Sequence, residues 1–258
     1  MTRRAVTYSS YLRVPELLAL QVEQSGGEAG PEHDELLFIV IHQVYELWFK
    51  QLGHELRAVQ RALEASDTDR ALHLLNRVLK ILKTLVAQVD VLETMTPLQF
   101  LSFRDRLDSA SGFQSAGFRS VEAALGIRDP GAVGAQPAGS PARAALEAAH
   151  AERSVWDSFL VYLAARPYPV PPDATVPDER VQEIIVDAYH GDPDTALVAE
   201  RLVDLDEGVQ EWRYRHVKMV ERTIGTKRGT GGSSGVEYLR ATLFRPAFPD
   251  LWEIRSRL

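Results

Sequence analysis

Apolar residues recur at steps of three and four along most of this chain, and this spacing restricts the possible folds more than any other feature. The clearest stretch covers residues ~68–95, with apolar positions at Leu72, Leu75, Leu79, Leu82, Val86, Val89 and Leu92. Such steps place side chains on one face of an α-helix. No alternating run bounded by turn signals indicates a sheet. The sequence therefore predicts an all-α protein, built as a bundle of long helices.

The same spacing, together with capping signals, predicts the remaining helices. They are expected at residues 32–65, from Thr96–Pro97 onward, at 115–125 (closed by Gly126), at 142–165 and at 194–223. The first of these would be on the order of 50 Å long at about 1.5 Å per residue. Threonine as N-cap and proline at the first helical position are typical of a helix start.

Other segments interrupt the helical pattern. An N-terminal arm with a short helix is expected at residues 1–25, and a flexible connector at 127–141. Residues 167–177 contain five prolines and predict an extended crossing. Residues 225–235 are expected to form a glycine- and serine-rich loop between two helices. With no change of composition between its halves, the chain (1–258) is expected to be one domain.

Composition and charge exclude several classes of protein. The chain has no cysteine, so disulfides, thiolate metal sites and cysteine nucleophiles are excluded. A formal charge of −7 argues against general nucleic-acid binding and favours a small-molecule ligand or no ligand. The N-terminus lacks the apolar region of a signal peptide, and no apolar run approaches the ~20 residues of a membrane span. A cytoplasmic protein is expected, and helices this long favour an oligomer.

One aromatic stripe could carry chemistry. Phe38, His42, Tyr45 and Phe49 follow one another at steps of four, three and four, so they share one helix face. This pattern is typical of an aromatic core with one hydrogen-bonded histidine. It also fits a small-ligand pocket with aromatic walls and one polar group. The spacing alone leaves both interpretations open.

A second histidine, His216, lies late in the helix expected at 194–223. A lone helical histidine is usually structural. Two well-separated helical histidines in an aromatic-rich chain also permit one axial ligand of a haem iron and one distal group. Zinc or non-haem iron would need a tighter cluster. Different helix faces are expected for the members of the adjacent pairs His33–Asp34 and His54–Glu55.

Two further features could bind a charged ligand. Phe100 and Arg104 lie one helical turn apart, and the planar fork of an arginine binds both oxygens of a carboxylate. The alternative is a surface arginine. Residues 230–235 (TGGSSG) offer backbone N–H groups and hydroxyls to a charged group, or form a solvated linker. A similar turn of small residues occurs at 109–112.

Four blocks of this sequence together resemble the tryptophan 2,3-dioxygenase family, in the family's order and over nearly the whole chain. They are HDELLFIVIHQVYELWFKQ (33–51), ETMTPLQFLSFRDRL running into ASGFQSAGFR (93–119), WRYRHVKMVERTIGTK (212–227) and GTGGSSGVEYLR (229–240). The segment TYSSYL (7–12) is similar to the family's amino-terminal arm.

The resemblance implies an activity and a cofactor. It implies a helical homotetramer with one haem b per subunit, and O₂ as co-substrate. The expected reaction opens the indole ring of L-tryptophan between C2 and C3, giving N-formyl-L-kynurenine with both oxygen atoms from O₂. By motif position, His216 would be the proximal iron ligand. His42 would be the distal histidine that faces the indole N–H.

Further roles follow from the same motifs. Phe38 would stack in the indole pocket, with Phe100 close to it, and Arg104 would bind the substrate carboxylate. Thr230 would contact the amino-acid end of the substrate. The distal pocket near the haem would be lined by Ser111 and Gly112. A neighbouring subunit's pocket would be completed by the arm residues Tyr8, Tyr11 and Leu12.

Two departures from the family pattern bear on substrate preference. Some relatives have tyrosine at the position of Phe100, and the family often has glycine where this chain has Ser9–Ser10. The alternative function is a haem-dependent monooxygenase acting on a tryptophan derivative in secondary metabolism. A haem sensor would need an output module, for which the chain has no spare domain. Indoleamine dioxygenases typically lack a distal histidine, so His42 favours the tryptophan enzyme.

Overall fold

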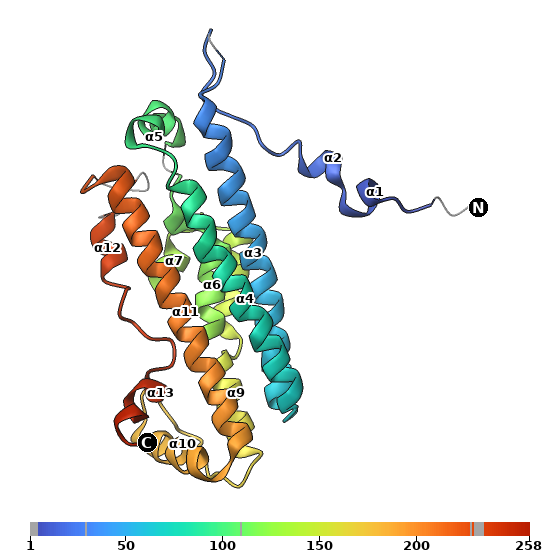
Figure 1. The fold of residues 1–258 in the computed structure, drawn as a ribbon, viewed down its shortest axis with the longest axis vertical. Coiled ribbons are helices and arrows are strands. Elements are labelled where there is room, and N and C mark those ends of the chain that lie inside the picture. The colour runs from blue at the N-terminus through green and yellow to red at the C-terminus, as the bar shows by residue number, and fades with distance from the viewer. Residues whose placement is uncertain (1–4, 29, 109, 228, 230–234) are drawn as a thin grey trace.

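The chain forms a bundle of helices in a computed structural model that describes residues 5–28, 30–108, 110–227, 229 and 235–258. Within these ranges every regular element is a helix. The long helices run side by side through the molecule (Figure 1) and are α3 (His33–Glu64), α4 (Thr68–Leu92) and α11 (Pro193–Ile224). The prediction of an all-α bundle is confirmed. None of the described helices combines the length and apolarity needed to cross a bilayer.

Shorter helices surround this central group. One set packs on or near α3 and comprises α6 (Ala116–Leu125), α7 (Pro130–Gly134), α8 (Pro141–Ala151) and α9 (Val155–Ala164). A second set lies at one end of α11 and comprises α10 (Glu179–Gly191), α13 (Pro249–Glu253) and η3 (Ile254–Ser256). Near the other end are α5 (Pro97–Phe103) and α12 (Val236–Arg240). Residues of these two helices line one cavity together with residues of η1 (Arg104–Leu107) and η2 (Gly112–Gln114).

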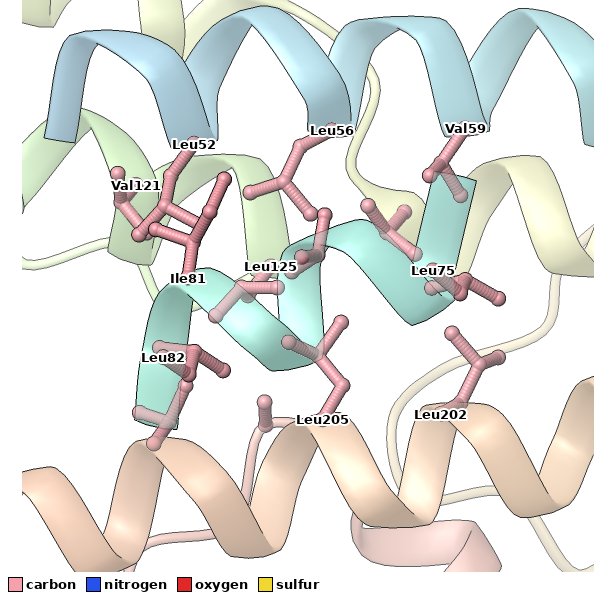
Figure 2. Packing of buried hydrophobic residues seen from close by; sticks show 14 of the residues in the cluster. Leu52, Leu56, Val59, Leu75, Ile81, Leu82, Val121, Leu125, Leu202 and Leu205 are labelled. Atoms are coloured by element: carbon pink, nitrogen blue, oxygen red, sulfur yellow. The ribbon is translucent and has the colours of Figure 1, made fainter. Parts of the chain in front are cut away.

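The core is a layer of branched aliphatic side chains in which α4 lies between α3 and α11. Leu56 of α3, Leu75 of α4 and Leu202 of α11 are at most 1% exposed. Figure 2 shows such side chains from both outer helices pointing toward α4, with Val121 and Leu125 of α6 closing one side. The apolar stripe predicted at residues 68–95 is therefore the buried face of the central helix, α4.

Capping side chains fix the helix starts predicted at Thr96 and Ser115. Thr96 Oγ1 accepts a hydrogen bond from Gln99 N at 3.4 Å, and Gln99 Oε1 accepts one from Thr96 N at 2.8 Å. Ser115 Oγ accepts from Phe118 N at 3.1 Å at the start of α6. That helix ends at Gly126, whose φ of 105° is readily adopted by glycine. These boundaries are confirmed.

The prediction of one helix over residues 142–165 is wrong, because the chain caps itself at Ser154. Helix α8 ends at Ala151 and α9 begins at Val155. Ser154 Oγ accepts from Asp157 N at 3.1 Å, and Asp157 Oδ2 accepts from Ser154 N at 2.8 Å. This reciprocal cap supplies hydrogen bonds to N–H groups at the start of a new helix, so the chain restarts there.

Two further elements differ from the expectation. Residues 127–141, expected as a flexible connector, include helix α7, which begins with Asp129 as N-cap and proline at the first position. Gln136 in the same segment donates a hydrogen bond from Nε2 to the Gln114 carbonyl at 3.0 Å. Helix α10 was not predicted, although the buried residues Val181, Ile185 and Ala188 recur at steps of four and three.

The N-terminal arm, with α1 (Tyr8–Leu12) and α2 (Val14–Leu17), extends away from the bundle (Figure 1). Its base is fixed to α3 by the buried carboxylate of Glu35, which accepts hydrogen bonds from Gln24 N at 2.8 Å and Ser25 N at 2.9 Å. The tip is exposed, with 79% of Tyr8 and 77% of Tyr11 accessible to solvent. The described chain therefore presents apolar arm residues that its own bundle does not cover.

Truncating the central helix should destabilise the bundle. Leu75→Ala is expected to lower the free energy of unfolding by about 2–5 kcal/mol, because it removes buried methyl groups and leaves a cavity. Leu98→Ala is the control: Leu98 is 79% exposed, and its change should stay within about 0.5 kcal/mol. Denaturant titration followed by circular dichroism measures both variants. Equal stability of the two variants would contradict this account of the core.

Candidate functional site

A cavity of about 520 Å³ opens among α3, α4, α5, α6, α11 and α12, at the end of the bundle away from α10. Its volume is within the usual range for small-ligand and cofactor sites. Most of its wall is apolar, and the aromatic side chains in the wall are Phe38, Tyr45, Phe49, Phe100, Phe113, Phe118, Trp212 and Tyr238. The aromatic stripe predicted on α3 is thus the wall of a cavity.

His42 lines this cavity from α3 and has a defined tautomer. Its Nδ1 lies 2.7 Å from the carbonyl oxygen of Phe38, one turn earlier. A carbonyl oxygen can only accept, so Nδ1 carries the proton and Nε2 of the neutral ring is left as an acceptor. Desolvation by the surrounding protein lowers the pKa of His42 from its ordinary value, although the bond to Phe38 opposes the shift. The site therefore offers a neutral imidazole.

Phenylalanines surround His42. The Phe38 ring centroid lies 4.0 Å from that of His42 and 5.9 Å from that of Phe100. Phe103 packs edge-on against Phe100, with centroids 5.5 Å apart, and its burial holds the end of α5 in the core. Arg104 follows directly in η1 and lines the cavity. A flat apolar ligand would therefore have a guanidinium at the edge of its pocket.

His216 lines the cavity from α11 and is held by stacking. Its ring lies parallel to that of Trp212, with an interplanar angle of 5° and centroids 5.2 Å apart. Burial lowers the pKa of His216 to about 4, and electrostatic interactions with His42 and with the guanidinium of Arg119 add to the shift. Within the described part of the chain, neither ring nitrogen has a hydrogen-bond partner. His216 is therefore neutral at physiological pH and has a lone pair available to a metal ion.

A buried charge cluster completes the wall near His216. Glu122 Oε2 accepts a hydrogen bond from Arg119 Nη1 at 2.6 Å, and Glu122 Oε1 accepts one from Arg213 Nη2 at 2.7 Å. All three residues are at most 7% exposed, and all line the cavity. Sequence reasoning missed this cluster, although Arg119 ends one of the quoted motifs. Nothing in the local sequence distinguishes a buried arginine from a surface one.

The predicted site residues separate into three groups. Those that line the cavity together are Phe38, His42, Phe100, Arg104, Ser111, Gly112 and His216. Those on the exposed arm, outside the cavity of their own chain, are Tyr8, Tyr11 and Leu12. Thr230 lies outside the described residues, but Gly229 and Gly235, on either side of it, both line the cavity.

Comparison with known proteins agrees with this site. A sequence profile of the family described as tryptophan 2,3-dioxygenase matches residues 1–137 and 180–258. The chain belongs to the tryptophan 2,3-dioxygenase family. The matched ranges contain both cavity histidines, both ends of the glycine-rich loop and the N-terminal arm. The resemblance found in the sequence motifs is confirmed.

Relatives in this family align over almost their full length. The tryptophan 2,3-dioxygenase of Anaeromyxobacter sp. (strain K) is 58% identical, over 98% of this chain and 97% of the relative. That of Herpetosiphon aurantiacus is 55% identical over 99% of both chains. The more distant enzyme of Caulobacter vibrioides is 40% identical over 98% of both. The family assignment therefore rests on whole chains and not on one shared motif.

Proposed function

We propose that this chain is a haem-dependent tryptophan 2,3-dioxygenase, which inserts both atoms of O₂ across the indole C2–C3 bond of L-tryptophan and gives N-formyl-L-kynurenine. The observation that carries the proposal is one apolar cavity lined by two neutral histidines from different helices, His42 and His216. Close relatives that are named for this activity support it.

The cavity suits a haem b, one per subunit. His216 supports this because its ring is oriented by Trp212, is neutral, and has no competing hydrogen bond among the described residues. The aromatic and aliphatic wall matches the apolar faces of a porphyrin. When bound, the haem iron supplies the centre at which O₂ reacts. His216 would be its protein ligand.

His42 would orient the indole ring. The bond from its Nδ1–H to the Phe38 carbonyl leaves Nε2 as an acceptor, which is what an indole N–H requires. Phe38, whose ring packs beside the imidazole, would stack on the indole, with Phe100 next to it. This arrangement contributes positioning and does not require His42 to act as a strong base.

The amino-acid end of the substrate would be held at the edge of the cavity. Arg104 would bind the carboxylate with its planar fork. Thr230, which lies outside the described residues, would contact the same end of the substrate, and Ser111 and Gly112 would line the distal pocket. Phenylalanine at position 100 has no hydroxyl to offer the carboxylate, so Arg104 would carry more of that recognition.

A homotetramer in the cytoplasm would complete the functional unit. The exposed side chains of Tyr8, Tyr11 and Leu12 support assembly into an oligomer, because the arm extends away from its own bundle and leaves them uncovered. In an oligomer these residues would close the pocket of a neighbouring subunit. The remaining exposed apolar positions of the arm, such as Leu18 and Leu20, would be covered in the same way.

Labelled oxygen tests the reaction. Incubation of the haem-loaded protein with ascorbate, L-tryptophan and isotopically labelled O₂ is expected to give N-formylkynurenine with both oxygens labelled, as measured by mass spectrometry. The matched variant His216→Ala should lose the Soret band and the activity, because it removes the iron ligand. A singly labelled product with an intact indole ring would contradict the proposal and indicate a monooxygenase. A wild-type Soret band in His216→Ala would exclude His216 as the ligand.

The pH dependence tests the role of His42. Only neutral His42 accepts the indole N–H, and its pKa lies below the ordinary value of about 6.5. We therefore expect kcat/KM for L-tryptophan to be retained as the pH falls to about 6.5, and to decline only below that value. His42→Ala should be slower and should lack this acid limb. A His42-dependent decline that begins well above pH 6.5 would refute this role.

Deletion of residues 1–12 tests the shared pocket. The truncated protein should bind L-tryptophan more weakly, because the neighbour's pocket is left open, while the Soret band of the haem stays unchanged. Analytical ultracentrifugation of both proteins reports the oligomeric state. A wild-type protein that is fully active as a monomer would be incompatible with a pocket completed by the arm.

A further inference from the structure

The most unusual group in the cavity wall is the guanidinium of Arg119, on α6. The residue is 7% exposed, and its guanidinium lies over the rings of Phe113 at 4.9 Å and Phe118 at 5.6 Å. Among the described residues it donates to Glu122 through Nη1, and its buried Nε has no partner. An arginine has five N–H groups, so most of the donors of Arg119 remain unused. Stacking holds the fork in place.

The charge of the cluster is also unbalanced. Both oxygens of Glu122 are taken, one by Arg119 and one by Arg213. Arg213 Nη1 donates to the carbonyls of Thr242 at 3.3 Å and Arg245 at 2.9 Å, which carry no charge. Two guanidinium groups and one carboxylate leave a net charge of +1 in a buried wall. Such a charge is stabilised by an anion, which the described side chains do not supply.

The other acidic residue of the cavity wall does not fill this role. Glu46 accepts a hydrogen bond from Ser115 Oγ at 2.5 Å, and no ion pair joins it to Arg119. The donors of Arg119 that no described residue satisfies are therefore available to a ligand in the cavity. Its planar fork favours a carboxylate, bound through two N–H groups.

The position of Arg119 indicates which carboxylate it binds. Phe118, its neighbour in sequence, packs against Trp212 with ring centroids 4.6 Å apart, and Trp212 in turn stacks on His216. Arg104 lies elsewhere, directly after Phe103 on the wall that carries Phe38 and His42. The cavity thus has one arginine on the His216 side and another on the His42 side.

We infer that Arg119, held by Glu122 and by the faces of two phenylalanines, is the binding site for a carboxylate side chain of the prosthetic group, while Arg104 serves the substrate. This assignment rests on the proposed function, since it presupposes a haem at His216. The two arginines of the cavity would therefore bind different carboxylates. Arg119 would bind a haem propionate, and Arg104 would bind the carboxylate of the amino acid.

A comparison of haem with haem dimethyl ester distinguishes carboxylate recognition from iron ligation. Both compounds can bind His216 through the iron, but only haem carries free carboxylates. The full-length protein is loaded with each, and release to excess apomyoglobin is followed in the Soret region. From the wild type, haem should leave about 30-fold or more slowly than its ester, the factor expected for a buried charged hydrogen bond. This comparison needs no variant.

Arg119→Gln should abolish the difference between haem and its ester. The variant should fold, because it leaves Glu122 paired with Arg213 and removes the net charge of the cluster; circular dichroism checks this. Arg119→Lys, which keeps the charge but not the fork, should retain part of the difference. The matched control Arg104→Gln, in the same cavity, should retain all of it while binding L-tryptophan, but not tryptamine, more weakly.

The outcomes are distinct. Equal release of haem and ester from the wild type overturns the inference. So does an Arg119→Gln variant that retains the difference and instead loses discrimination between L-tryptophan and tryptamine, because Arg119 would then serve the substrate. A wild-type protein that binds neither porphyrin contradicts the proposed function as well, whereas normal haem binding without the difference refutes the inference alone.

Discussion

The packing of α4 between α3 and α11 is the constraint on which the rest of the structure depends. Leu56, Leu75 and Leu202 belong to one buried layer that fixes the separation of the two outer helices. Those outer helices carry the two cavity histidines, His42 on α3 and His216 on α11. The aliphatic layer at one end of the bundle therefore sets the width of the cavity at the other. The geometry of the site therefore depends on leucines that do not themselves line the cavity.

The cavity lies where the packing changes from aliphatic to aromatic residues. Toward the start of α3, the residues facing inward are Phe49, Tyr45, His42 and Phe38, and in α11 Trp212 and His216 follow the leucine-rich part of the core. Planar rings stacked at fixed angles leave flat spaces between them, which branched aliphatic chains would fill. The aromatic rings also hold their polar neighbours: Trp212 orients His216, and Phe118 supports Arg119.

How far the sequence predicts this structure depends on the range of the interactions. The long helices follow from apolar periodicity, and the start of α5 follows from the Thr96 cap, because both signals are local. The break between α8 and α9 was missed, although Ser154 and Asp157 form a local capping box, because the apolar pattern continues across it. The Arg119–Glu122–Arg213 cluster could not be predicted. It joins α6 to α11 across 91 residues, and only the assembled bundle shows that these charges are buried.

The hydrogen bond from His42 to the Phe38 carbonyl has a consequence for discrimination among heteroaromatic rings. Its acceptor is a backbone atom of the same helix, so the direction of the imidazole dipole does not depend on solvent, on a neighbouring side chain or on the ligand. A bicyclic ring with oxygen, sulfur or an N-methyl group in place of the indole N–H would present no donor to Nε2. Such isosteres would fill the pocket equally well in shape but leave a desolvated lone pair unsatisfied. The pocket would then discriminate between ligands of the same size by whether one ring atom carries an N–H donor.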